Sequence, residues 1–227
     1  MKKKFINIVF YPLVFFRIIL FYFFKLFPYK IRRLFIQNEE NFKAEIIRRV
    51  AINYNYRIFI ETGTYLGNTS KYLANYFKKI LTVELDKDLF LKSQDNLKKY
   101  TNIECYNNDS ENFLKEIILN INEEAIFFLD AHYSGPGTSN LKGITPCVNE
   151  LKEISKSSIK SHVIIIDDIS DFSVSDNKQR LSEIISLIEN ISPNYKFYFD
   201  YDMMFALPNE KNHREFFKEI IPHFVIR

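Results

Sequence analysis

Glycine, cysteine and tryptophan are scarce in this sequence, and their scarcity narrows the class of protein. Of 227 residues, only five are glycine, two are cysteine and none is tryptophan. The two cysteines, Cys105 and Cys147, form no close-spaced pair, so neither a disulfide framework nor a zinc site is expected. A hydrophobic content of 47% and a charged content of 26% are typical of a globular protein with a sizeable core. The length suits one domain and an extension.

Acidic residues are absent from the first 35 positions, although those positions carry eight lysines and arginines. The net charge of +3 therefore hides an asymmetry, since the rest of the chain has 23 basic and 28 acidic residues. An acidic body argues against an enzyme that acts on nucleic acid. The basic N-terminal segment needs an explanation of its own.

That segment is also strongly apolar. Between Phe5 and Phe24, only Asn7, Pro12 and Arg17 interrupt a run of aromatic and aliphatic residues. Aromatic side chains interleaved with lysine and arginine suit a membrane surface with anionic headgroups. We therefore expect residues 1–36 to associate with the cytoplasmic face of a membrane, either lying on it or spanning it. A helix packed on its own domain or on a dimer partner, and a nucleic-acid arm, are the alternatives.

After residue 36 the hydrophobic period switches repeatedly between two and about four, which is typical of strands alternating with helices. We expect strands at 57–61, 80–86, 102–109, 125–130 and 162–168, and helices at 39–50, 68–77, 87–100, 110–121, 145–156 and 178–191. A closing hairpin and a helix at 213–221 complete the pattern. Five β–α units predict one α/β domain, residues 37–227, with a mainly parallel, doubly wound sheet.

Each expected central strand ends in polar residues. The ends read Glu61-Thr62-Gly63, Glu84-Leu85-Asp86, Asn108-Asp109-Ser110, Asp130-Ala131-His132 and Asp167-Asp168. Ligands of such sheets bind beyond the carboxyl ends of the strands. These residues therefore predict one binding site at one edge of the sheet.

The first of these ends is a turn with two glycines, in the stretch IFIETGTYLGNTS. Gly63 and Gly67 let the backbone approach a ligand closely. The turn lacks both GxGxxG and a phosphate-loop lysine, and Glu61 would repel a phosphate but suits an ammonium or sulfonium. Glu84 is placed to bind ribose hydroxyls, and Asp109 to bind the exocyclic amine of adenine. A ligand with a cationic amino-acid portion, a ribose and an adenine fits all of these residues, and S-adenosylmethionine (SAM) is such a ligand.

ETGTYLGNTS followed by VELD resembles the class I SAM-dependent methyltransferases, over about residues 40–210. Within that class the sequence is similar to metal-assisted O-methyltransferases of the catechol and macrolide-sugar type. The loop HYSGPGTSNLKGITP is similar to one in methyltransferases of bacterial polysaccharide gene clusters. The resemblance implies a Rossmann-like, seven-stranded sheet with an antiparallel last strand. It implies a SAM site at Glu61, Gly63, Tyr65, Gly67, Glu84, Asp109, Ser110 and Asp130.

The resemblance also implies Mg²⁺, because Asp130, Asp167 and Asp168 fall on the metal-ligand positions of that family. Three converging carboxylates would repel one another without a cation, and hard oxygen ligands suit Mg²⁺. The alternative is that one aspartate binds a loop amide while another faces water. Asp130 and His132 are the candidate catalytic residues, with His132 as proton acceptor. The alternative for His132 is packing within its loop.

The sequence thus predicts a SAM-dependent O-methyltransferase, assisted by Mg²⁺, that acts on a hydroxyl of a sugar or glycan intermediate of polysaccharide biosynthesis at the membrane. A homodimer is compatible with the sequence, and no nucleic-acid partner is expected. Two alternatives remain open. One is a nicotinamide-dependent sugar oxidoreductase, in which Glu84 would also bind ribose, and the other is a non-catalytic, membrane-tethered binding module.

Overall fold

The computed structural model describes residues 39–130, 146–169, 178–200 and 202–208. The chain divides into two compact units, Met1–Phe42 and Lys43–Arg227, and the described residues belong almost entirely to the second. The expected membrane segment 1–36, its boundary with the domain, and the expected helix 213–221 lie outside the described residues. Within the described ranges, no helix combines the length and the apolar character needed to cross a bilayer.

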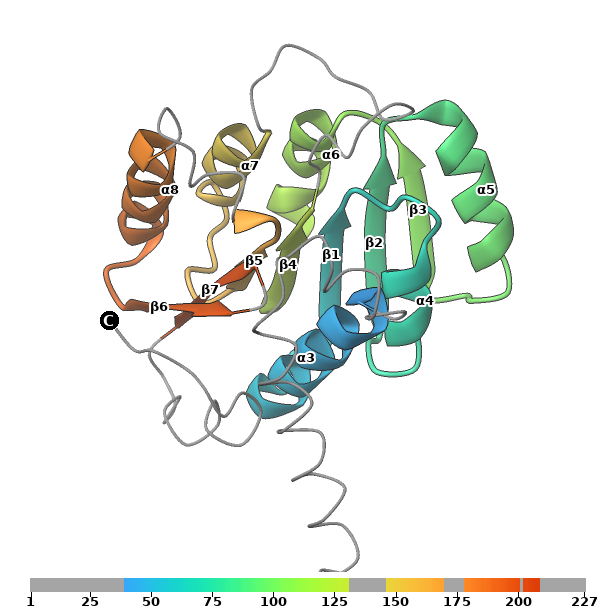
Figure 1. Cartoon of the computed structure of the whole chain (residues 1–227), viewed down its shortest axis with the longest axis horizontal. Coiled ribbons are helices and arrows are strands. Elements are labelled where there is room, and N and C mark those ends of the chain that lie inside the picture. Colours follow the sequence, from blue (N-terminus) through green and yellow to red (C-terminus); the bar gives the residue numbers. More distant parts are fainter. Residues whose placement is uncertain (1–38, 131–145, 170–177, 201, 209–227) are drawn as a thin grey trace, which may run out of the picture. The chain divides into compact units, whose positions relative to one another are not determined.

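A seven-stranded sheet forms the centre of the domain, with the strand order β3-β2-β1-β4-β5-β7-β6 (Figure 1). Strands β1 to β5 pair in parallel, and β7 pairs antiparallel with both β5 and β6. This confirms the predicted Rossmann-like sheet with an antiparallel last strand. The strands are β1 (Ile58–Thr62), β2 (Lys79–Glu84), β3 (Ile103–Asn107), β4 (Ala125–Leu129), β5 (Val163–Ile166), β6 (Tyr195–Asp200) and β7 (Met203–Pro208).

Helices connect the parallel strands, as the alternating hydrophobic period predicts. Two begin directly at strand ends, where Asp86 and Asp109 cap α5 and α6 by accepting hydrogen bonds from backbone N–H groups of the first turn. Such caps typically contribute about 1 kcal/mol each. The helices are α3 (Glu39–Tyr54), α4 (Asn68–Leu73), α5 (Lys87–Leu97), α6 (Ser110–Ile117), α7 (Cys147–Ile154) and α8 (Lys178–Ile191), and a 3₁₀ turn, η1 (Ile118–Asn120), follows α6.

Both faces of the sheet are buried, which explains why the central strands are apolar throughout. On β1, Ile58 and Ile60 join the core under α6, α7 and α8. Phe59, which points to the opposite face, packs with residues of α3 and α4 such as Ile47 and Leu73. Alternate side chains of one strand thus serve two cores, and a polar residue inside a strand has to find a partner within the protein.

His162 lies directly before β5, at the edge where the parallel strands begin. Its side chain is fully buried, its Nδ1 accepts the Ala125 N–H (3.1 Å), and its Nε2 pairs with the Ser157 hydroxyl (2.9 Å). Burial lowers the pKa of His162 from 6.5 to about 4, because the imidazolium would lose its water there. This histidine therefore joins β4 to β5 in its neutral form.

The neutral state of His162 predicts an acid-sensitive stability. Between pH 6.5 and 4 the unfolded chain binds a proton at this residue that the folded protein does not bind, so the free energy of unfolding falls as the pH falls. The loss amounts to about 3 kcal/mol. A His162→Asn variant lacks this loss, so its deficit against the wild type should shrink by that amount from pH 7 to pH 4 in urea denaturation. A deficit that stays constant over this range would contradict the assignment.

Candidate active site

The parallel register brings the predicted polar residues to one edge of the sheet. Thr62 pairs with both Val83 and Leu129, Leu129 pairs with Ile166, and Glu84 pairs with Asn107. The ladder continues one residue beyond β4 and β5, because the Asp130 N–H donates to Thr62 O and the Asp167 N–H to Leu129 O (both 3.0 Å). Glu61, Glu84, Asp109, Asp130 and Asp167 therefore lie at or just beyond the carboxyl ends of adjacent strands.

The glycine turn after β1 adopts a backbone that requires glycine. Gly63 has φ 89° and Gly67 has φ 79°, both in the left-handed region. The N–H groups of Gly63 and Thr64 both donate to Val83 O (3.0 Å), which ties the turn to the end of β2. A Cβ on Gly67 would lie 2.9 Å from the Leu97 side chain of α5. The turn is therefore packed tightly against its neighbours.

Glu84 fixes the middle of this turn. Its Oε2 accepts the Tyr65 N–H at 2.7 Å, and its Oε1 accepts the Asp86 N–H at 3.0 Å. Burial raises the pKa of the Glu84 carboxyl, and these backbone N–H groups partly offset the rise by stabilising the ionised form. A carboxylate offers about four acceptor positions, so two such bonds leave capacity for the ribose hydroxyls that the sequence predicts. The Tyr65 side chain itself is half exposed.

Glu61 lies beneath the turn and is almost fully buried. Its Oε2 accepts hydrogen bonds from the hydroxyls of Ser70 (2.6 Å) and Thr82 (2.8 Å). The sequence did not predict these two partners. The one signal for them was Thr82, a polar residue inside the apolar strand β2. The two hydroxyls hold the Glu61 side chain in one orientation under the glycine turn.

Asp109 and Ser110 lie where β3 turns into α6. Asp109 Oδ1 accepts the N–H groups of Glu111 (3.0 Å) and Asn112 (3.3 Å), so this carboxylate caps α6. Both bonds use one oxygen of the carboxylate, and binding of an adenine amine by the other oxygen stays a prediction. Ser110 is buried.

A buried glutamate that lies close to Ser110 and Thr62 was not predicted. Glu150 of α7 is 1% exposed, and its Oε1 has no hydrogen-bond partner among the described residues. The Thr62 hydroxyl lies nearby but outside hydrogen-bond geometry. Burial raises the pKa of Glu150 to about 7. The signal in the sequence was its spacing, since Glu150 shares the helix face of the core residues Cys147 and Leu151.

The three predicted metal ligands lie near one another, but an ammonium group lies among them. Lys43 Nζ of α3 is 2.8 Å from both carboxylate oxygens of Asp167 and 3.8 Å from Asp168 Oδ1. Burial alone would lower the pKa of Lys43, but Asp167, Asp168 and Asp130 together raise it well above its usual value. Burial and the two neighbouring aspartates raise the pKa of Asp130.

This arrangement does not fit a Mg²⁺ ion. Both oxygens of Asp167 already bind the Lys43 ammonium, and Oδ1 also accepts the Asp168 N–H (2.9 Å). Mg²⁺ requires near-octahedral oxygen ligands at about 2.0–2.1 Å, so it would have to displace the ammonium. In the described parts of the chain, no group of three acidic, histidine or cysteine side chains is arranged to hold a metal. The expected Mg²⁺ thus finds no support, and His132 lies outside the described residues.

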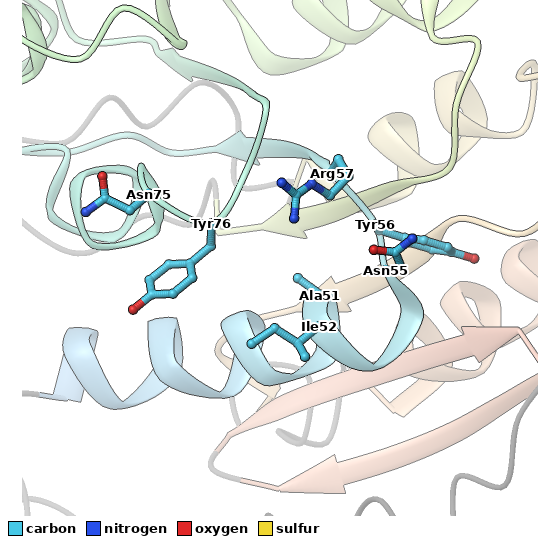
Figure 2. Close-up of a pocket in the computed structure, with 7 residues that line it drawn as sticks. All are labelled: Ala51, Ile52, Asn55, Tyr56, Arg57, Asn75 and Tyr76. Carbon is cyan, nitrogen blue, oxygen red and sulfur yellow. The ribbon is translucent and has the colours of Figure 1, made fainter.

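A surface hollow lies at the other edge of the sheet, where β1 begins (Figure 2). Arg57 and Tyr76 line it from opposite sides, and none of the predicted site residues contributes to it. The candidate active site is therefore separate from this hollow. The lining residues are Ala51, Ile52, Asn55, Tyr56, Arg57, Asn75 and Tyr76.

Comparisons with known proteins agree with this topology. A family model described as ribosomal RNA adenine dimethylase matches residues 30–128. The structure is similar to the O-methyltransferase TomG from Streptomyces achromogenes, involved in tomaymycin synthesis, in complex with SAM. That likeness has a TM-score of 0.57 at 15% identity and covers 73% of this chain and 79% of TomG. The fold is that of the class I SAM-dependent methyltransferases.

A second methyltransferase structure supports the same fold. An O-methyltransferase from Bacillus cereus in complex with SAH has a TM-score of 0.54 at 18% identity, and covers 73% of this chain and 80% of its own. A search of curated protein sequences gives no match. At such low identities the likeness establishes the class I methyltransferase fold, while the substrate has to be argued from the site.

The packing around Gly67 predicts that a side chain at this position destabilises the folded protein. A Gly67→Ala variant places a side chain at φ 79° and against Leu97, so we expect it to lose about 3 kcal/mol of unfolding free energy, from backbone strain and crowding together. In a Leu97→Ala background the crowding is absent and only the backbone strain of about 1–2 kcal/mol remains. Urea denaturation of the four proteins of this cycle separates the two costs. Equal losses in both backgrounds would show that Leu97 does not confine the turn.

Proposed function

We propose that this protein is a SAM-dependent methyltransferase that methylates a hydroxyl oxygen. The observation that carries the proposal is the glycine turn held by Glu84 at the carboxyl edge of the parallel sheet, through the 2.7 Å bond to the Tyr65 N–H. The residues present fit this cofactor. Gly63 and Gly67 give the turn its positive φ angles, and the carboxylates of Glu61 and Glu84 lie at it, where they suit a sulfonium and an ammonium.

The residues divide the work of binding. Glu84 would bind the ribose hydroxyls, the end of β3 at Asp109 and Ser110 would face the adenine, and the turn with Glu61 beneath it would bind the methionine end. When bound, SAM supplies an electrophilic methyl group on a positively charged sulfur. The protein then has to hold the acceptor oxygen in line with that methyl group and to exclude water, since positioning contributes most to such a transfer.

Asp130 is the described residue best suited to bind the acceptor. It lies at the end of β4, directly beside β1 and its glycine turn, and a carboxylate there can accept a hydrogen bond from a hydroxyl. It would accept the hydrogen bond of the acceptor hydroxyl and take up the proton that the hydroxyl releases. His132, two residues further on, remains the other proposed proton acceptor.

Oxygen as the methylated atom is favoured by the two structural relatives, which are both O-methyltransferases. A sugar or glycan acceptor at a membrane is proposed from the sequence alone, through the loop at 132–146 and the segment 1–36. The match to a ribosomal RNA adenine dimethylase model favours a second candidate, N-methylation of adenine in RNA. The excess of acidic residues after position 35 argues against that candidate, because RNA binding relies on lysine and arginine.

Calorimetry tests the proposal through Glu84. We expect the wild type to bind SAM and not NAD(P), and Glu84→Gln to bind SAM about 10- to 100-fold more weakly, because a charge-assisted acceptor of the ribose is lost. Glu104→Gln is the matched control, since Glu104 lies on the adjacent strand β3 but is exposed and paired with Lys79. Its SAM affinity should be unchanged.

Two outcomes would count against the proposal: no binding of SAM by the wild type, or an unchanged affinity in Glu84→Gln. Binding of NAD(P) in its place would support the oxidoreductase alternative. Transfer of a labelled methyl group from SAM, offered in parallel to a glycolipid fraction and to ribosomal RNA, then separates the hydroxyl acceptor from adenine. Binding of SAM without transfer to either fraction would favour the non-catalytic module.

A further inference from the structure

The ends of β4 and β5 carry more negative charge than the proposed reaction uses. Asp130, Asp167 and Asp168 follow two adjacent strands, and the Asp167 side chain is 3% exposed. Carboxylates withdrawn from water in this way need a cation or a set of hydrogen-bond donors nearby. The structure supplies a cation from a helix that is distant in the sequence.

Lys43 provides that cation and is fixed in place by its helix. Its neighbour Ala44 and the next-turn residue Ile47 are both fully buried in the core beneath the sheet. The Lys43 side chain is 14% exposed and contacts Asp167 through both carboxylate oxygens, across 124 residues of sequence. The pair is therefore part of the packed domain, unlike the exposed ion pairs on its surface.

The bond pattern around Asp167 leaves little room for a second cation. The Lys43 ammonium binds both of its oxygens, and the Asp168 N–H binds one of them in addition. A divalent ion at this carboxylate would lie beside a partly buried ammonium and would be repelled by it. An ammonium and a divalent ion are thus alternatives at this point.

We infer that the Lys43 ammonium permanently takes the cation position among Asp130, Asp167 and Asp168, so that methyl transfer by this protein needs no divalent metal ion. Lys43 is a positioning residue. It neutralises Asp167, whose backbone N–H is bonded to the end of β4, and so leaves Asp130 as the carboxylate available to the acceptor in the proposed function. The metal-free reaction rests on the proposed function, whereas the cation position does not.

Manganese binding tests the cation position without any enzyme assay. The full-length protein, stripped with a chelator, is titrated with Mn²⁺, and the free ion is measured by electron paramagnetic resonance. We expect no stoichiometric binding by the wild type or by Lys71→Met, a control that removes an exposed lysine of α4. Lys43→Met frees the Asp167 side chain from the ammonium that holds it, so we expect the three aspartates to reorient around a single Mn²⁺. Lys43→Met/Asp167→Asn should lose that site again.

Activity supplies a readout that a merely structural lysine would not change. Wild-type turnover should be insensitive to chelator and to added Mg²⁺. Lys43→Met should be about 10- to 100-fold slower and should recover with Mn²⁺ or Mg²⁺, whereas Lys43→Arg keeps the charge and should remain independent of metal. Stoichiometric Mn²⁺ binding by the wild type, chelator-sensitive wild-type turnover, or a Lys43→Met variant that neither binds nor responds to metal would each overturn the inference.

The two proposals fail separately. If the wild type does not bind SAM in calorimetry, the methyltransferase proposal fails, but the Mn²⁺ titrations still decide which cation the aspartates hold. If SAM binds and is turned over only with a divalent ion, the methyltransferase stands and the Lys43 inference falls. Should Lys43→Met not fold, the wild-type titration and its response to chelator still decide the question.

Discussion

The parallel register of β1 to β5 is the constraint on which the site depends. Because five strands run in one direction, every strand end and every following turn comes to the same edge of the sheet. A shift of β2 by one residue would turn Glu84 to the opposite face and remove its bond to the Tyr65 N–H. The glycine turn and the position of Glu84 therefore both depend on the register of β2.

Four of the carboxylates at this edge are each stabilised in a different way. Glu61 is bound by two hydroxyls, Glu84 by backbone N–H groups, Asp109 by the start of a helix, and Asp167 by an ammonium. Side chains already fixed by such bonds do not need to reorganise when a ligand binds, which is the basis of preorganisation. The result is a rigid, negatively charged edge that suits a cofactor carrying a sulfonium.

The sequence predicted the features that follow from local pattern. Alternation of hydrophobic periods gave the central strands and helices, and the polar residue at each strand end gave the edge of the sheet where the site lies. The glycines at 63 and 67 indicated a turn whose backbone approaches a ligand, which stays a prediction. The structure gives these glycines two other reasons, their positive φ angles and the contact of Gly67 with Leu97.

What could not be predicted depends on contacts between distant segments. Lys43 stands in a helix rich in charged residues, NFKAEIIRRV, and nothing in that pattern points to Asp167, 124 residues later. The sequence indicated that the three aspartates need a positive charge nearby, but the only cation that it suggested was a metal ion. Glu150 was missed because a single acid in an amphipathic helix is normally taken for a surface residue, although its spacing placed it on the buried face.

Hydrogen–deuterium exchange with and without S-adenosylhomocysteine, the product that SAM leaves after transfer, tests the central claim most directly. The account predicts that this ligand slows exchange in the turn at 63–67 and at the ends of β2, β3 and β4, and leaves the opposite edge around Arg57 and Asn75 unchanged. Protection confined to that opposite edge, or no protection at all, would contradict a cofactor site at the carboxyl ends of the strands.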